Sequence, residues 1–161
     1  MAICQEIGER RGEGMTLDSL GMAYLNLGQL GEAIACLRQA LAICREIGDG
    51  RGEGYALSNL GDTYWDSGLL DEAIAHFRLA IGVRRAAGDR HGEAQTLHRL
   101  GLVLHESGQR ASARQSWQQA LAIFEELGDP QAALVRSRLE RDGAAQADCR
   151  DGRSCEGRPP D

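Results

Sequence analysis

Three histidines recur at seven-residue intervals in the second half of the chain, at positions 91, 98 and 105. Imidazoles bind metal ions and transfer protons near neutral pH. Seven residues of α-helix span about 10 Å at a rise of 1.5 Å per residue, so these three side chains cannot share one ion. We therefore predict no metal site and no cofactor. We interpret His91, His98 and His105 as exposed or groove-lining residues whose protonation would make binding sensitive to pH.

Other arrangements of chemically active residues are also absent from the sequence. The five cysteines form an odd set without a secretion signal, as expected of reduced thiols inside a cell. Cys149 and Cys155 lack the tighter pairing of zinc ligands. The sequence contains no Ser/His/Asp arrangement and no HExxH, and the RGEG at 11–14 and 51–54 has the wrong spacing for a phosphate loop. We predict that the chain is not an enzyme.

The composition excludes further classes. The chain has 161 residues, a net charge of −6 and no lysine, because all 18 basic residues are arginine. A net-acidic chain is a poor direct partner for nucleic acid. No apolar run approaches the roughly 18 residues of a membrane helix, and the N-terminus is not a signal peptide. We expect a single cytoplasmic domain without nucleic-acid or membrane partners.

A repeat of 40 residues determines which elements position any site. More than half of the positions in residues 1–40 recur in 41–80, and residues 81–120 continue the register. Each unit predicts two helices, and the complete repeats cover about 11–48, 51–88 and 91–128. The first helices are expected at about 11–27, 51–67 and 91–107, and the second helices at about 31–48, 71–88 and 111–128. This pattern predicts an all-α protein built of antiparallel helix pairs.

Glycines and aspartates mark the predicted helix ends. Gly28, Gly68 and Gly108 stand where one helix stops and the chain reverses, as a glycine with positive φ would. The Gly-Asp pairs at 48–49, 88–89 and 128–129 combine a C-terminal glycine with an N-cap for the next helix. Within the second helices, apolar residues recur at steps of three and four, which indicates one buried face. We further predict that Gly21, Gly61 and Gly101 allow the two helices of each pair to approach closely.

The motif Leu20-Gly21-x-x-Tyr24, followed by Gly28, Ala33, Leu37 and Ala40, resembles the tetratricopeptide (TPR) helix pair. Phe77 and Trp117 take the aromatic place held here by Leu37. This resemblance covers about residues 1–141 and implies a right-handed α-solenoid, the TPR superhelix. The closing run ALAIFEELGDPQAALVRSRL also resembles the C-terminal TPR regions of actinobacterial SARP and NB-ARC-type regulators.

The two ends of the chain are expected to differ from the repeats. Met1 is in register with Leu41, so residues 1–8 are interpreted as the end of a half-repeat, and the chain as a fragment of a longer protein. The open apolar face of this half-repeat predicts end-to-end self-association. Residues 130–142 are expected to form a polar capping helix. Residues 143–161 lack hydrophobic periodicity and are expected to be disordered, so the TPR domain is predicted to span 1–142.

In TPR proteins, peptides lie along the first helices on the concave side of the superhelix, and the resemblance implies the same groove here. It projects several acids, two large aromatic residues and no arginine, which predicts a basic or amphipathic peptide or protein partner. The resemblance places these residues in the groove: Asp18, Met22, Leu25, Tyr55, Ser58, Asp62, Trp65, Asp66, His98, Leu102, His105 and Glu106.

Two functions remain open at this point. The first is a non-catalytic interaction module that forms the C-terminal sensor of a larger bacterial transcriptional or signalling regulator. The second is a stand-alone TPR adaptor or scaffold. The family's chaperone-binding clamp is not matched, because Asp18 and Met22 occupy two places where that clamp needs Lys and Asn. Asn59 and Arg99 match two other places, but they alone do not make the clamp. The sequence does not identify the partner.

Overall fold

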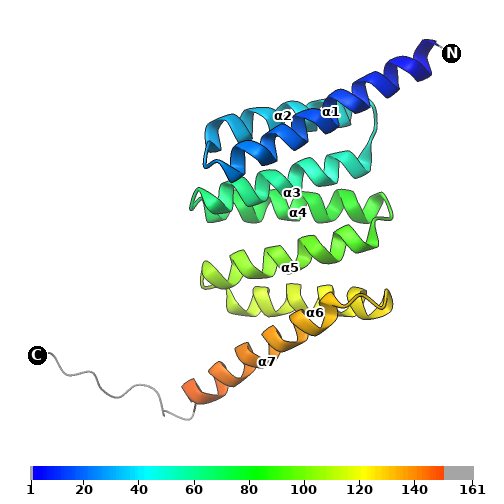
Figure 1. Ribbon diagram of the computed structural model, residues 1–161. Coiled ribbons are helices and arrows are strands. Elements are labelled where there is room, and N and C mark those ends of the chain that lie inside the picture. Colours follow the sequence, from blue (N-terminus) through cyan, green and yellow to red (C-terminus); the bar gives the residue numbers. More distant parts are fainter. Residues whose placement is uncertain (1, 151–161) are drawn as a thin grey trace, which may run out of the picture.

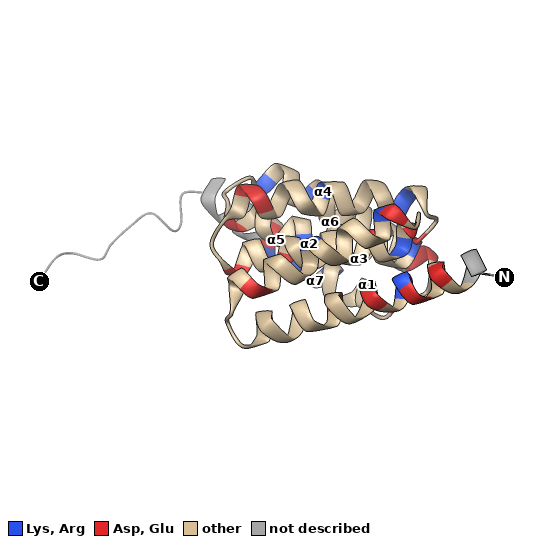
Figure 2. Cartoon of the chain, turned by 90° about the horizontal axis from the view of Figure 1, so that it is seen from above, with Lys and Arg blue, Asp and Glu red and all other residues tan. Residues whose placement is uncertain are grey.

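The structure is a computed structural model that describes residues 2–150, and the side chains of residues 5–143. Every regular element in the described range is an α-helix (Figure 1). The helices stack in chain order as antiparallel pairs, and the last helix packs against the third pair (Figure 1); Figure 2 shows the same stack from above. They are α1 (Ala2–Asn26), α2 (Leu30–Glu46), α3 (Gly50–Asp66), α4 (Leu70–Ala86), α5 (Arg90–Glu106), α6 (Arg110–Glu126) and α7 (Gln131–Arg150). The predicted all-α helical-repeat solenoid is confirmed.

Helices α2 to α6 begin and end within two residues of the positions predicted from the glycine and aspartate signals. All six turn glycines have φ between 65° and 80°, which residues with a Cβ rarely adopt. Asp49 and Asp89 cap the helices that follow, because each side chain accepts a hydrogen bond of 3.0 Å from the backbone nitrogen three residues later.

The two helices of each pair meet where the first helix has a glycine. A Cβ added to Gly61 would lie 2.7 Å from Cε1 of Phe77. A Cβ on Gly101 would lie 2.2 Å from Nε1 of Trp117, and one on Gly21 would lie 2.7 Å from Cγ of Leu37. The predicted close approach at these glycines is confirmed. It buries Phe77 and Trp117 in a core shared by all the repeats.

The predicted break between a half-repeat at 1–8 and a helix at 11–27 is wrong. Residues 2–26 form one uninterrupted helix, and Gly8 is not among the glycines with positive φ. The physical reason is the absence of packing at this point among the described residues. A Cβ added to Gly8 would have no neighbour within 4 Å, and Ile7 is 41% exposed. The described residues around Gly8 therefore offer no apolar packing to offset the loss of helical hydrogen bonds that a turn there would cause.

The C-terminal prediction also needs correction. The capping helix was expected at 130–142, but α7 continues to Arg150, so residues 143–150 are helical rather than disordered. Val135 anchors the helix because its side chain is fully buried. Once nucleated, a helix continues readily through residues such as the alanines and Gln146 in this stretch. Residues 151–161 of the predicted tail lie outside the described residues.

Candidate binding face on the first helices

The predicted groove residues lie on α1, α3 and α5, and we call the surface that they form the first-helix face. None of the helices in the described range qualifies as a membrane span. Met22, Leu25 and Leu102 are half-buried on this face. The exposed members are Tyr55, Asp66, His105 and Glu106, and the other half-buried ones are Asp18, Asp62, Trp65 and His98. Ser58 is 3% exposed, so it does not line an open groove.

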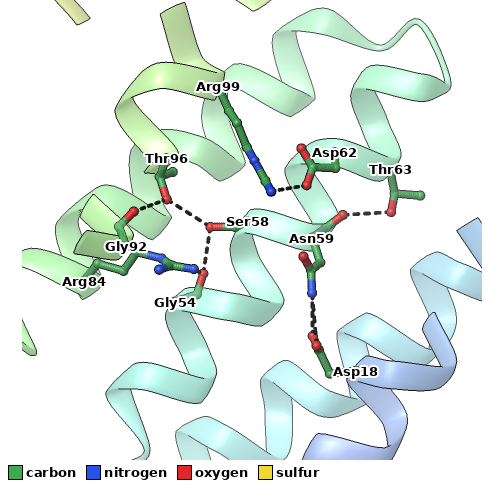
Figure 3. Close-up of polar contacts among 10 residues, drawn as sticks. All are labelled: Asp18, Gly54, Ser58, Asn59, Asp62, Thr63, Arg84, Gly92, Thr96 and Arg99. Carbon is green, nitrogen blue, oxygen red and sulfur yellow. Dashed lines mark hydrogen bonds and ion pairs between the residues drawn. The ribbon is translucent and has the colours of Figure 1, made fainter. Parts of the chain in front are cut away.

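A polar contact joins the first helices of repeats one and two. Asn59 on α3 donates from its Nδ2 atom to both carboxylate oxygens of Asp18 on α1, each at 3.0 Å (Figure 3). Burial raises the pKa of Asp18, and the hydrogen bond from Asn59 opposes that shift. The Asp18 carboxylate is therefore already hydrogen-bonded within the chain.

A second contact joins repeats two and three. Asp62 on α3 forms an ion pair with Arg99 on α5, as the close-up shows (Figure 3). Burial raises the pKa of Asp62 to about 6, the Arg99 charge lowers it, and neighbouring Asp66 raises it. The sequence analysis expected an acidic groove without arginine. Arg99 stands one residue beyond the predicted position His98 and partly neutralises this surface.

The two large aromatic residues of the face also have partners. Nε1 of Trp65 donates a hydrogen bond of 2.6 Å to Oε2 of Glu106 on α5, and part of its ring packs against the core. Tyr55 is 53% exposed, and the guanidinium carbon of Arg84 lies 4.5 Å from the centre of its ring. Trp117 is 1% exposed, so it is the buried one of the two tryptophans.

Ser58 lies beneath the face and forms a buried link between α3 and α5. Its hydroxyl donates to the carbonyl of Gly54 at 2.9 Å and lies 3.2 Å from Oγ1 of Thr96. Thr96 donates in turn to the carbonyl of Gly92 (Figure 3). The role of Ser58 is to hold two repeats together.

The three histidines have three different surroundings. His91 lies 2.8 Å from a carboxylate oxygen of Asp129, and His105 stacks on Trp117 with ring centres 5.7 Å apart. Nε2 of His98 is buried and has no hydrogen-bond partner among the described residues. Burial, followed by the charges of Arg138 and Arg99, lowers the pKa of His98, so its ring stays neutral at pH 7.

A pocket opens on the first-helix face between α1 and α3. Its volume is about 160 Å³, and its base is formed by Ala40 and Cys44 of α2. Met15 and Tyr55 stand at its rim with more than half of their surface exposed, and Asp18 and Asp49 supply carboxylates to its wall. Burial, and after it the charge of Asp49, raises the pKa of the Cys44 thiol, which is therefore neutral. The pocket combines apolar walls with two acids.

The sequence analysis missed Arg84 as a functional neighbour of the groove, and it noted Asn59 and Arg99 only as matches to two positions of the chaperone-binding clamp. A signal for Arg84 existed, because it stands 40 residues after Cys44, on the face predicted to be buried. A charged residue at a buried position needs partners nearby. The contacts that Asn59 and Arg99 make with the neighbouring repeat did not follow from that match, because they depend on how the repeats stack.

A model of the tetratricopeptide repeat family matches residues 12–86 and 52–126. Together these matches span most of the chain, which therefore belongs to the tetratricopeptide repeat family. The repeats of this family are generally protein–protein interaction modules, and their fold is typically a non-catalytic scaffold. Among curated proteins, none matches this chain significantly.

Several solved structures share the fold. RapI in its apo form superposes with a TM-score of 0.78 at 18% identity, over 85% of this chain and 50% of its own. Aspartyl phosphate phosphatase F from Bacillus subtilis gives 0.73 at 19% identity, over 90% of this chain and 42% of its own. The first TPR domain of Spaghetti (RPAP3), bound to the HSP90 peptide SRMEEVD, gives a TM-score of 0.65 at 17% identity, over 84% of this chain and 94% of its own. This chain spans half the length of RapI and less than half the length of the phosphatase.

Proposed function

We propose that the first-helix face binds a basic or amphipathic segment of a protein partner, and that the chain does this without catalysing a reaction. The observation that carries the proposal is the pocket between α1 and α3. It opens beside two large exposed side chains, Met15 and Tyr55, and its wall holds the carboxylates of Asp18 and Asp49. Exposed apolar side chains around a concave pocket are the usual anchors of a peptide.

The remaining charges of the face favour a cationic partner. Asp66 and Glu106 are exposed, and Glu106 is held in place by Trp65. Asp62 and Asp18 are already held by Arg99 and Asn59, so their contribution to a partner is smaller than the sequence indicated. A positively charged segment would meet an acidic surface with an indole at its centre, which suits both ion pairing and cation–π contact.

The test is the selection of peptides from a random displayed library on the immobilised chain, followed by affinity measurements on chosen variants. We expect the selected peptides to be enriched in basic and large apolar residues. Asp66→Asn should weaken them more at low salt than at high salt, because exposed charges are screened. Leu79→Ala, on the exposed side of α4 and 54% exposed, is the matched control and should leave affinity unchanged. Selection of acidic peptides, or equal loss in the control, would refute the proposal.

We further propose that this module is the C-terminal sensor of a larger cytoplasmic regulator of the SARP or NB-ARC type. The closing run at residues 120–139 supports it. The alternative is a stand-alone adaptor. The coding sequence upstream decides between them. An in-frame continuation that encodes a winged-helix or a nucleotide-binding domain supports the regulator, whereas a start site at Met1 supports the adaptor.

A further inference from the structure

The pocket between α1 and α3 has a counterpart one repeat later, where the chain fills the space with its own arginine. Position 44 is Cys, and the residue in register 40 positions later is Arg84, which is 3% exposed. The cavity at the later interface is about 90 Å³, compared with about 160 Å³ at the first. The pocket between α1 and α3 is therefore larger than the later one, and it has Cys44 where the later one has Arg84.

The contacts of Arg84 define what this space accepts. Nη1 of Arg84 donates to Oδ2 of Asp89 at 2.9 Å. Its Nε lies 3.4 Å from the carbonyl oxygen of Gly54 (Figure 3). Its guanidinium also lies over the ring of Tyr55. A Cβ on Gly92 would lie 1.6 Å from Nη1, so the arginine needs a glycine there. The site is made of one carboxylate, two glycines and one aromatic ring.

The first pocket keeps most of these groups. Asp49 stands in register with Asp89, Gly14 with Gly54, and Gly52 with Gly92. Met15 stands in register with Tyr55, and Tyr55 itself, whose ring contacts Arg84, lines this pocket from α3. Asp18 adds a second carboxylate where the later site has Ser58. The third interface is different. Phe124 occupies the position of Arg84 and is fully buried, and Ala94 replaces the glycine at 54.

An arginine of the chain already approaches Asp49 from outside. Nε of Arg11 lies 3.2 Å from Oδ2 of Asp49, with the side chain of Arg11 55% exposed. Such an exposed pair contributes little stability. A better-placed cation can therefore displace Arg11 from the Asp49 carboxylate.

We propose that the pocket between α1 and α3 is a subsite for an arginine side chain of the protein partner, with the guanidinium paired to Asp49 in place of Arg11, next to the carboxylate of Asp18 and beside Met15 and Tyr55. The planar donors of a guanidinium suit two carboxylates better than the ammonium group of a lysine does. The inference rests on the proposed function, because it names the side chain that anchors the partner on the first-helix face. It also excludes a phenylalanine anchor, since the pocket shares more groups with the Arg84 site than with the Phe124 site.

The test is an NMR titration of the full chain with N-acetyl-arginine amide. N-acetyl-citrulline amide is the neutral isostere, and N-acetyl-phenylalanine amide is the apolar competitor. We expect the arginine probe to shift the amides of Gly14, Asp49 and Gly52, and to bind at least about five-fold more tightly than citrulline because charge-assisted hydrogen bonds are the stronger ones. Equal binding of arginine and citrulline, tighter binding of phenylalanine, or no shift at these amides would overturn the proposal.

Two variants sharpen the test. Cys44→Arg lets the chain fill the pocket as Arg84 fills the next one, and Gly52 leaves room for it, so this variant should lose the probe. Asp49→Asn keeps a good N-cap residue but removes the charge, so it should weaken the probe about five-fold while the chain stays folded. Asp49→Asn decides the matter if Cys44→Arg does not fold, and binding unchanged in Asp49→Asn would overturn the subsite.

The outcomes separate the subsite from the proposed function. If library peptides bind the first-helix face while the arginine probe leaves the pocket amides unshifted, the subsite is wrong and the proposed function stands. If the probe binds the pocket with the expected selectivity but no peptide binds the face, the proposed function is wrong. In that case the pocket is a guanidinium site without a peptide groove.

Discussion

Nε1 of Trp65 donates a hydrogen bond of 2.6 Å to Oε2 of Glu106, which stands 41 residues later on α5. The contact ties the centre of the first-helix face to the following repeat and leaves part of the indole exposed. Trp117 is 1% exposed behind it. The two tryptophans therefore serve as separate probes, one at the surface and one in the core.

Iodide quenching should distinguish them. In Trp117→Phe, only Trp65 fluoresces, and we expect strong quenching because its ring is partly accessible. In Trp65→Phe, only Trp117 fluoresces, and we expect little quenching. Similar Stern–Volmer constants for the two variants would show that Trp65 is covered, and the binding face would then lack an accessible aromatic centre.

The second prediction concerns the close approach at Gly61. Gly61→Ala places a methyl group 2.7 Å from Cε1 of Phe77, so the helices must separate, at a cost of about 1–3 kcal/mol in the free energy of unfolding. Gly82→Ala is the matched control, because Gly82 is an exposed helical glycine with nothing within 4 Å of an added Cβ. It should stabilise the chain by about 0.5–1 kcal/mol. Urea unfolding measures both, and two changes of the same sign would contradict the packing described here.

These glycines show how much of the fold could be predicted from the sequence. Repeat length, turn glycines and N-cap aspartates act locally, so the helix ends followed directly from them. The turn expected at Gly8 failed because a local signal reverses a helix only where tertiary contacts favour reversal. The helix through residues 143–150 was missed because hydrophobic periodicity was required of a segment that needs only helix propensity and a nucleus in α7.

The candidate site was less predictable for a different reason. The predicted residues lie on α1, α3 and α5, but several of their side chains are held by the neighbouring repeat. Asp18 contacts Asn59 and Asp62 contacts Arg99, with sequence separations of 41 and 37 residues. These separations lie on either side of the 40-residue period, so each contact depends on how far the two side chains reach between stacked helices. That reach is a property of the stacked structure and is not visible in one repeat.

A third prediction concerns the protonation of Asp62. Its pKa of about 6 should appear in a carboxyl-carbon NMR titration. Arg99→Gln should raise this pKa further, because it removes the charge that lowers it. Asp66→Asn should lower it, because it removes a neighbouring negative charge. Shifts in the opposite directions would contradict the ion pair and the surroundings of Asp62.

The same group links stability to pH. The pKa of Asp62 is higher in the folded chain than its ordinary value of 3.8, so between about pH 4 and pH 6 the folded state binds more protons than the unfolded state. The contribution of Asp62 to stability is therefore fully present below pH 4 and is lost as the pH rises through 6. Asp62→Asn should remove this part of the pH dependence in thermal unfolding. An unchanged dependence in the variant would assign it to other groups.

A fourth prediction concerns the N-terminal part of α1, where Ile7 is 41% exposed. We expect weak end-to-end self-association at high concentration through this apolar segment. Ile7→Glu should reduce it, whereas Met15→Glu, farther along α1 on the first-helix face, should not. Sedimentation equilibrium measures both, and a monomer at hundreds of micromolar in the unchanged chain would refute the expectation.

The central claim is that a protein partner binds along α1, α3 and α5. The most direct measurement is the amide NMR footprint of a library-selected peptide on the full chain. The account predicts that shifts and line broadening concentrate on the first-helix face, from Met15 through Tyr55 and Trp65 to His105, and that the exposed side of α4 around Leu79 is unaffected. A footprint on the second helices α2, α4 and α6, with the first-helix face unchanged, would contradict it.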